Sequence, residues 1–281
     1  MTATAAAKSF SGKSALITGA SSGIGRALAE RLARDGARLA LVGRDPARLN
    51  AAAAACRGAG SPKAEAYPFD LRDSARIAEM VGGIKRDFGG APDVLIHAAG
   101  TATVGLLEET PVAAVGEVLA VNLLAAMALA AALVPDMRKR GQGLLVFITS
   151  GTAHFGVPTE AAYCASKAGL ERFAESLRGE LLGSGVLVSV VSPGPAETPL
   201  MRSPQTYGPV RPIGRPKVAA QPHELAERIV SRLGQGTEYI ELSARTRLVR
   251  HLRYWAPALL RRVIERQSRR ENGAQSAPHA S

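Results

Sequence analysis

Cysteine and aromatic residues are scarce in this chain. Its 281 residues include two cysteines, Cys56 and Cys164, and only 4% aromatic residues. The cysteines have neither the spacing of a metal site nor the density of a disulfide scaffold, which favours a reducing compartment. We therefore expect a cytoplasmic location and no bound metal.

Long apolar runs are missing as well. Residues 1–9 carry one lysine and no apolar stretch long enough for a signal peptide. Nowhere do about 18 apolar residues follow one another, as a membrane-spanning helix requires. The sequence thus predicts neither export nor a membrane span.

Acidic residues are nearly absent from one basic segment, residues 245–270. This segment contains nine arginines and one acid, Glu265, so it contributes +8 of the formal net charge of +11. The rest of the chain is close to balanced. Because the segment lacks any known nucleic-acid recognition motif, we expect no nucleic-acid partner.

What the chain does have is a regular alternation of apolar runs and helical patterns. Seven runs predict strands, several of them apolar on both faces, as strands covered by helices on both sides are. This order predicts a single Rossmann-type, doubly wound parallel sheet in the α/β class. The predicted strands are residues 14–18, 38–42, 64–69, 94–97, 144–149, 186–192 and 238–242, and the predicted helices are 25–35, 45–56, 74–88, 111–140, 160–182 and 222–233.

These elements define the expected domain organisation. One dinucleotide-binding and catalytic domain spans residues 1–243, a basic amphipathic tail spans 244–270, and residues 271–281 are expected to be disordered. Eight prolines lie between residues 193 and 222. Because so long an irregular stretch within a compact domain is usually functional, we expect a substrate lid over about residues 195–221.

A glycine-rich turn follows the first predicted strand. Residues 18–25 read Thr-Gly-Ala-Ser-Ser-Gly-Ile-Gly and lead into an amphipathic helix. Glycines let the backbone approach a pyrophosphate, whose charge is met by the free amides of the helix N-terminus. The turn alone is a weak signal, but between the first strand and the first helix it predicts a nucleotide site.

The end of the second predicted strand bears on the choice of cofactor. A fold that prefers NAD places an acid there for the ribose hydroxyls, whereas this chain has Gly43 followed by Arg44. A guanidinium at this place can pair with a 2'-phosphate, which favours NADP(H). The alternative is that Arg44 is an ordinary solvated loop charge.

Three polar residues form a candidate catalytic group. Tyr163 and Lys167 are four residues apart on one face of a predicted helix, and Ser150 follows a predicted strand. A nearby cation stabilises a phenolate, so we expect Lys167 to lower the tyrosine pKa towards the range of an acid/base catalyst. Taken singly, each residue also has an ordinary structural explanation.

Together with the glycine turn, these residues resemble the short-chain dehydrogenase/reductase family, and the resemblance runs from about residue 14 to 242. It implies that Tyr163 is the general acid/base, that Ser150 orients the carbonyl, and that Lys167 also binds the nicotinamide ribose. Asn122 matches an asparagine that holds a water of the proton relay, or it is a hydrogen-bonded core amide. Cofactor-binding roles are implied for Gly19, Ser21, Ser22, Gly23, Ile24, Gly25, Arg44, Asp70, Leu71, Ala98, Gly100, Tyr163, Lys167, Pro193, Gly194 and Thr198.

One motif departs from the family. Where the family usually has Asn-Asn-Ala-Gly, this chain has His97 followed by Ala-Ala-Gly. The asparagine side chain there is thought to brace the sheet, so the change puts local packing in doubt more than nucleotide binding. We favour a hydrogen-bonded core histidine over a catalytic one.

The basic segment has its apolar residues at helical spacing, and Pro257 is expected to divide it into two helices. Arginine with leucine and tryptophan suits a helix on an anionic membrane surface. Packing on the catalytic domain or on a partner subunit is an equal alternative, and a second copy is expected because the family resemblance implies a homodimer or homotetramer.

The tail is weakly similar to that of lipid ketone reductases such as 3-ketosphinganine reductases. We therefore expect an enzyme that interconverts a lipophilic ketone and a secondary alcohol with NADP(H). An alternative is a 3-oxoacyl thioester reductase, whose acidic carrier or phosphate would meet basic residues of the lid. A nucleotide-sensing binding protein is a third hypothesis. The basic lid residues are Arg202, Arg211, Arg215 and Lys217.

Overall fold

The computed structural model describes residues 10–210 and 219–275 of the chain. Seven strands form one sheet in the order β3-β2-β1-β4-β6-β7-β9, and every neighbouring pair is parallel. All seven predicted strands are present, which confirms the predicted fold class. The strands are β1 (Ser14–Thr18), β2 (Arg38–Gly43), β3 (Ala64–Pro68), β4 (Val94–His97), β6 (Gly143–Ile148), β7 (Val186–Ser192) and β9 (Tyr239–Glu241).

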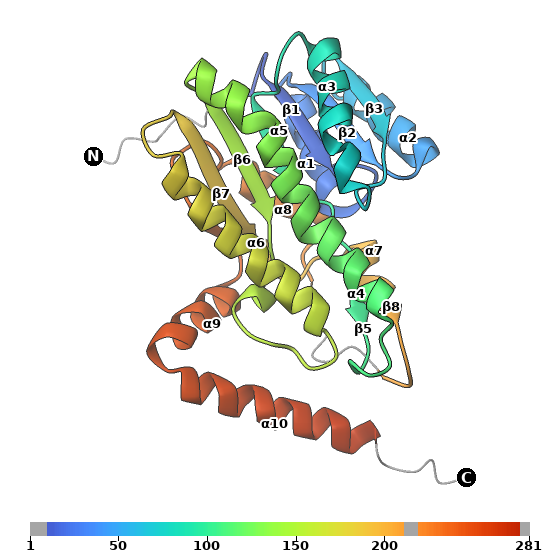
Figure 1. Cartoon of the computed structure of the whole chain (residues 1–281), viewed down its shortest axis with the longest axis vertical. Helices are drawn as coiled ribbons and strands as arrows, with labels where there is room; N and C mark the ends of the chain where they lie inside the picture. The colour runs from blue at the N-terminus through green and yellow to red at the C-terminus, as the bar shows by residue number, and fades with distance from the viewer. Residues whose placement is uncertain (1–9, 211–218, 276–281) are drawn as a thin grey trace.

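Helices cover both faces of the sheet (Figure 1). On one face lie α1 (Gly23–Arg34), α2 (Pro46–Gly58) and α8 (Pro222–Val230). On the other lie α3 (Ile77–Phe88), α5 (Ala125–Arg140) and α6 (Ala161–Glu180). The alternation of residues along each strand produces this three-layer arrangement, because successive side chains point to opposite faces.

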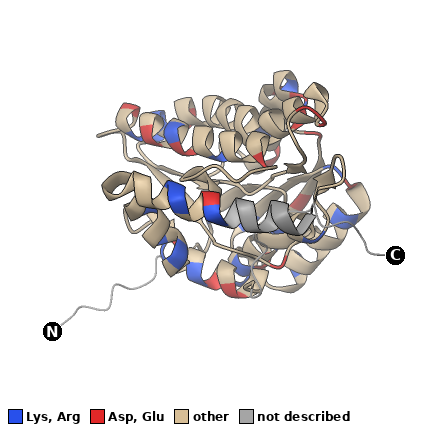
Figure 2. Cartoon of the chain, turned by 90° about the horizontal axis from the view of Figure 1, so that it is seen from below, with Lys and Arg blue, Asp and Glu red and all other residues tan. Residues whose placement is uncertain are grey.

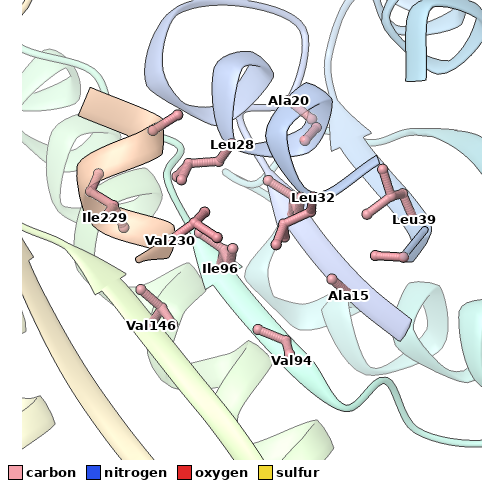
Figure 3. Packing of buried hydrophobic residues seen from close by; sticks show 14 of the residues in the cluster. Ala15, Ala20, Leu28, Leu32, Leu39, Val94, Ile96, Val146, Ile229 and Val230 are labelled. Atoms are coloured by element: carbon pink, nitrogen blue, oxygen red, sulfur yellow. The ribbon is translucent and has the colours of Figure 1, made fainter. Parts of the chain in front are cut away.

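Strand β1 shows how the two cores arise. Ala15 and Ile17 belong to the core under α1, whereas Leu16, between them, belongs to the core under α3 and α5. Leu28 and Leu32 of α1 are fully buried in the first core, beside strands β1 and β4 (Figure 3). A strand buried on both faces leaves its polar groups only at its ends, so functional side chains must follow the strands.

The strand order reverses between β1 and β4. From β1 the chain proceeds outward through β2 and β3, and it then returns to the other side of β1 with β4. In an open parallel sheet, such a reversal leaves a crevice at the carboxyl ends of the two strands. The glycine turn follows β1 and the segment after His97 follows β4, so the topology places both at this crevice.

The long predicted helix over residues 111–140 has three parts. After α4 (Val112–Leu119), the turn Ala120–Leu124 has π geometry, and α5 continues to Arg140. Within the described residues, Val112–Arg140 is long and apolar enough to cross a membrane, with a hydropathy of 2.3 over its best 18-residue window. The sequence still has no unbroken run of about 18 apolar residues here, and the helix passes this test because its few polar residues leave a high mean hydropathy. In this fold, its residues from Ala125 to Met137 bury one side of the helix against α3 and the sheet.

The lid and the tail contain shorter elements. A two-residue strand, β8 (Gln205–Thr206), pairs in parallel with β5 (Thr103–Val104), which ties the lid to the loop after β4. Pro257 separates α9 (Ala244–Trp255) from α10 (Pro257–Gln275), as predicted. Helix α10 extends to Gln275, past residue 271, from which disorder is expected on the sequence alone. Residues 276–281 lie outside the described part of the chain.

Candidate active site

A cavity opens at the carboxyl ends of the central strands. Its lining includes the glycine turn after β1, the segment after β4, Ser150 after β6, and the turn after β7. Helix α6 contributes Tyr163 and Lys167. The fold therefore brings most of the predicted site residues together: the cavity is lined by Gly19, Ser22, Gly23, Ile24, Gly25, Ala98, Gly100, Ser150, Tyr163, Lys167, Pro193, Gly194 and Thr198.

The glycine turn has the shape of a phosphate cradle. A side chain at Gly19 would meet the backbone of Ala99 at 2.8 Å, and one at Gly25 would meet the carbonyl oxygen of Gly19 at 2.4 Å. Ser22 caps α1 without a side-chain hydrogen bond, and the first turn of the helix has no acid. The N-terminal amides of α1 thus face the cavity with no competing carboxylate, which fits a dinucleotide pyrophosphate.

The residues predicted to contact the adenosine end lie beside the cavity rather than in its lining. Arg44 is exposed at the end of β2, and Gly43 packs near the Ser21 hydroxyl, 3.5 Å from where a side chain at position 43 would begin. After β3, Asp70 is held mainly by hydrogen bonds from Arg72, which lower its pKa, and Arg44 adds to this effect. Leu71 is buried in the core, 5% exposed.

Ser150, Tyr163 and Lys167 converge on one end of the cavity. The Ser150 hydroxyl lies near enough to the Tyr163 phenol to lower its pKa, and it accepts from the backbone N–H of Thr152 at 3.3 Å. The Lys167 ammonium lies 5.8 Å from the centre of the Tyr163 ring and donates to the carbonyl of Ile148 at 3.0 Å. The sequence predicted that these three residues act together, and the structure places all three in the lining of one cavity.

The acid/base properties differ from the sequence expectation. Burial raises the pKa of Tyr163 to about 12, against which the hydrogen bond from Ser150 acts in the lowering direction. Burial also lowers the pKa of Lys167 to about 8. The tyrosine pKa is therefore raised rather than lowered as expected from Lys167, because burial of the phenol is the largest contribution. The phenol of Tyr163 is accordingly protonated at neutral pH.

Asn122 lies at the centre of the π turn and is fully buried. Its side chain accepts from the backbone N–H of Thr101 at 2.8 Å and donates to the Thr101 carbonyl and the Ser166 hydroxyl, both at 2.9 Å. These bonds join the helix to the segment after β4 and to α6. Because π turns inside α-helices are frequent at functional sites, the position suits either role considered for Asn122.

His97 is a fully buried histidine at the end of β4. Its Nδ1 lies 3.0 Å from the hydroxyl of Thr18 at the end of β1. Its Nε2 faces the backbone of Val121 and Asn122 in the π turn without reaching good hydrogen-bond geometry. Burial, with a contribution from Lys167, lowers its pKa to about 3, so His97 is neutral and braces the two strands as the sequence analysis favoured.

Much of the rest of the cavity lining is apolar and includes residues that the sequence analysis did not single out as site residues. Strand β5, the loop after Ser150, the lid and the two tail helices contribute to it. Its members share no local sequence pattern, because they come from five separate segments, and only the tertiary fold brings them together. They include Val104, Phe155, Val157, Pro158, Leu200, Met201, Pro204, Val249 and Ile264.

A buried polar cluster attaches α9 to the loop after Ser150. His154 lies 3.6 Å from Glu171 and 3.5 Å from Glu241, and its pKa is lowered to about 4 by burial and by neighbouring arginines. From α9, Arg250 pairs with Glu241 at 3.1 Å and Arg253 donates to the His154 carbonyl at 2.8 Å. The tail therefore packs on the catalytic domain through this side of α9.

Known proteins share this sequence pattern and fold. Residues 13–206 match the short chain dehydrogenase family. A ketoacyl reductase, HetN, of Nostoc sp. is 40% identical over 185 residues, which are 66% of this chain and 64% of that protein, slightly less than two thirds of its length. The dehydrogenase/reductase SDR family protein 7-like of Drosophila melanogaster is 34% identical over 257 residues, 88% of this chain and 78% of that protein.

Solved structures of short-chain dehydrogenases and alcohol dehydrogenases are similar in fold to this chain. A short-chain dehydrogenase from Streptomyces avermitilis has a TM-score of 0.78 and 28% identity, with 94% of this chain and 99% of that chain covered. An alcohol dehydrogenase from the archaeon Thermococcus sibiricus, complexed with 5-hydroxy-NADP, has a TM-score of 0.72 and 28% identity, covering 82% and 95%.

Proposed function

The chain belongs to the short-chain dehydrogenase/reductase family of oxidoreductases, which act on CH–OH groups with a nicotinamide cofactor, and on that premise we propose that it reduces a lipophilic ketone with NADPH. The observation that carries the choice of substrate is the apolar part of the lining of the cavity that holds Ser150 and Tyr163. A binding surface of this kind favours substrates with a large apolar part, since burying apolar area is what stabilises their binding.

In this mechanism the Ser150 hydroxyl donates a hydrogen bond to the substrate carbonyl and fixes its position. Tyr163, whose phenol is neutral at pH 7, gives its proton to the oxygen as the alcohol forms. Lys167 stabilises the phenolate left on Tyr163, and its hydrogen bond to the Ile148 carbonyl holds it beneath the ring. A nicotinamide cofactor, held by the glycine turn and the turn after β7, supplies the hydride.

Two features support NADP(H) over NAD(H). Gly43 leaves no carboxylate at the end of β2 for the ribose hydroxyls, and the neighbouring Arg44 is exposed and has no ion pair with the described side chains of residues 10–210 and 219–266. An exposed, unpaired guanidinium is free to make a charge-assisted contact with a 2'-phosphate. We also propose that the protein is cytoplasmic and that it forms a homo-oligomer. The mass of the protein in solution tests the second proposal.

A second candidate is a 3-oxoacyl thioester reductase, which the similarity to a ketoacyl reductase favours. The structure offers limited support for a basic lid. Arg202 is engaged by Glu197 at 3.2 Å, so its charge is offset. The other three basic lid residues, Arg211, Arg215 and Lys217, lie outside the described residues.

The test is a panel of ketones assayed with NADPH and NADH. It should contain long-chain amino ketones, simple long-chain ketones and 3-ketoacyl thioesters of matched chain length. The proposal expects turnover that rises with chain length and does not require a thioester. Turnover restricted to thioesters would move the assignment to the second candidate.

A further inference from the structure

The two tail helices present an apolar surface to solvent. Leu248 is 59% exposed and Trp255 is 85% exposed on α9, and Leu259 and Val263 are 52% and 51% exposed on α10. Figure 1 shows α10 as a long helix lying below the sheet domain, and Figure 2 shows it crossing the lower face of the molecule. We call these four residues the outer apolar surface. No described residue covers it.

The orientation of α9 is fixed by its opposite side. Thr246 is buried against Gly151, and Arg250 and Arg253 bond to the cluster around His154. At about 100° per residue, Leu248 and Trp255 lie seven residues apart on one line of the helix, roughly opposite this anchored side. The apolar line therefore points outward because the arginines of the inner side hold the helix in place.

Positive charge flanks the apolar surface. Arg247 is exposed and lies one residue before Leu248, beside the apolar line, whereas Arg245 lines the catalytic cavity. On α10, Arg262 and Arg266 are exposed one turn apart. Among the residues whose side chains are described, Arg247, Arg262 and Arg266 have no ion pair, so their charge is available to a partner.

We propose that α9 and α10 together dock on an anionic lipid surface, with the outer apolar surface inserted at the headgroup boundary and the flanking arginines on the phosphates. A protein partner would need carboxylates complementary to every one of these cations, whereas an anionic membrane supplies negative charge over its whole area. Aromatic and leucine side chains flanked by arginine suit such an interface.

The same helices connect this surface to the active site. Val249 and Ile264, on the inner sides of α9 and α10, line the catalytic cavity, and Ile264 also lines a smaller depression with Phe155 and Leu260. A ketone dissolved in the lipid would therefore reach the cavity along the inner side of the two helices. This access route rests on the proposed function, whereas the docking surface does not.

The test uses the only tryptophan of the chain, Trp255, as its probe. Full-length protein is mixed with phosphatidylglycerol–phosphatidylcholine vesicles or with pure phosphatidylcholine vesicles, without ketone or cofactor. The proposal expects a blue shift of Trp255 emission and quenching by lipids brominated in the acyl chain with the anionic vesicles, both weakened by salt. An unchanged spectrum with anionic vesicles, or equal binding to neutral ones, overturns it.

Matched variants separate docking from unfolding. L248Q/L259Q should lower partitioning onto anionic vesicles about tenfold or more, because apolar side chains at the lipid boundary carry much of the binding energy. R262Q/R266Q should remove most of the preference for anionic lipid. L182Q and R86Q/K139Q are the controls, since these residues are exposed elsewhere on the molecule, and they should bind as the wild type does.

Two further results overturn the proposal in distinct ways. Equal losses in L182Q and in L248Q/L259Q would mean that the outer apolar surface is not specific. A blue shift that depends on protein concentration without lipid, with a doubled mass in solution, would assign the surface to a second copy of the chain. Ketone reduction in detergent solution is measured separately, so failure of docking with intact activity leaves the proposed function in place.

Discussion

Tyr163 is the residue on which the proposed chemistry depends most. Replacing it with phenylalanine removes only the hydroxyl, whose pKa the neighbouring Ser150 lowers. Because a positioned acid/base group contributes about 10² to 10⁴-fold, we expect the turnover number of Tyr163→Phe to fall by that factor while NADPH binding stays close to normal. Steady-state kinetics and the fluorescence of bound NADPH measure the two quantities.

A matched control is Tyr67→Phe, which removes a phenol bonded to Asp87 at 2.7 Å, far along the chain from the catalytic residues. It should leave the turnover number unchanged. If Tyr163→Phe keeps more than about a tenth of the wild-type rate, another group donates the proton.

Arg44 carries the predicted choice of cofactor. Loss of a charge-assisted contact with the 2'-phosphate costs about 1.5–3 kcal/mol, which corresponds to a tenfold or greater rise in the NADPH Michaelis constant of Arg44→Ala. The NADH constant should hardly change, and Arg86→Ala, an exposed arginine on α3, should change neither. Equal effects of Arg44→Ala on both cofactors would show that Arg44 does not contact the phosphate.

His97 predicts a measurable acid sensitivity of the fold. Its pKa is about 3 in the folded protein against 6.5 ordinarily, so below pH 6.5 the unfolded chain binds a proton that the folded one excludes. The contribution of His97 to the free energy of unfolding is therefore complete above pH 6.5. It declines as the pH falls towards 3, by at most about 1.4 kcal/mol per pH unit.

His97→Asn removes this titration, so its free energy of unfolding should decline less steeply between pH 6.5 and pH 4.5. Urea unfolding at several pH values measures the slope, and other titrating groups such as His154 are common to both proteins. Parallel pH profiles for the two proteins would mean that His97 is not held neutral.

At the scale of elements, the π turn Ala120–Leu124 connects three parts of the site through one side chain. Asn122→Leu keeps a similar volume but leaves the N–H and carbonyl of Thr101 without this partner, whereas the Ser166 hydroxyl still donates to the Tyr163 carbonyl. Each polar group left unpaired in the interior costs about 1–3 kcal/mol, so we expect a loss of about 2 kcal/mol or more in the free energy of unfolding.

Thermal denaturation measures the loss, and Asn50→Leu, at an exposed position of α2, is the control for the same substitution. A melting temperature of Asn122→Leu equal to that of Asn50→Leu would mean that the turn is held by its backbone alone.

The elements also show how far the sequence could be interpreted. The strands were predicted closely because a strand buried on both faces appears in the sequence as a short continuous apolar run, a pattern that few other elements share. The π turn was not predicted, since Asn122 is one polar residue within a continuous helical pattern. The residues that attach α9 to the loop after Ser150 were also missed, because His154, Glu171 and Arg253 are distant in sequence and are joined only in the folded chain.

The candidate catalytic residues stand out in the sequence for a different reason. Tyr163 and Lys167 have a fixed spacing on one helix, and the glycine turn is contiguous, so both are visible as local patterns. Their environment is not local. Burial, which sets the pKa of Tyr163 at about 12, depends on the packing of several segments, and the expected lowering by Lys167 was wrong for that reason.

In the whole molecule, the candidate catalytic site and most of the excess positive charge occupy different regions. The cofactor cradle and the catalytic residues lie at the carboxyl ends of the sheet, whereas the excess of positive charge lies on the two tail helices, which also close one side of the cavity. This arrangement links the substrate side of the cavity with the surface proposed to meet lipid.

The central claim is that the chain transfers hydride to a ketone at the site of Ser150 and Tyr163. The most direct measurement incubates the full-length protein with NADPH deuterated at C4 of the nicotinamide and a long-chain ketone, and then determines the mass of the alcohol formed. With the cofactor deuterated on the face from which hydride is transferred, the proposal predicts one deuterium on the carbinol carbon for the wild type and almost no product for Tyr163→Phe. NADPH that binds while no ketone of the panel gains deuterium, with either face labelled, would contradict the claim and indicate a nucleotide-sensing protein.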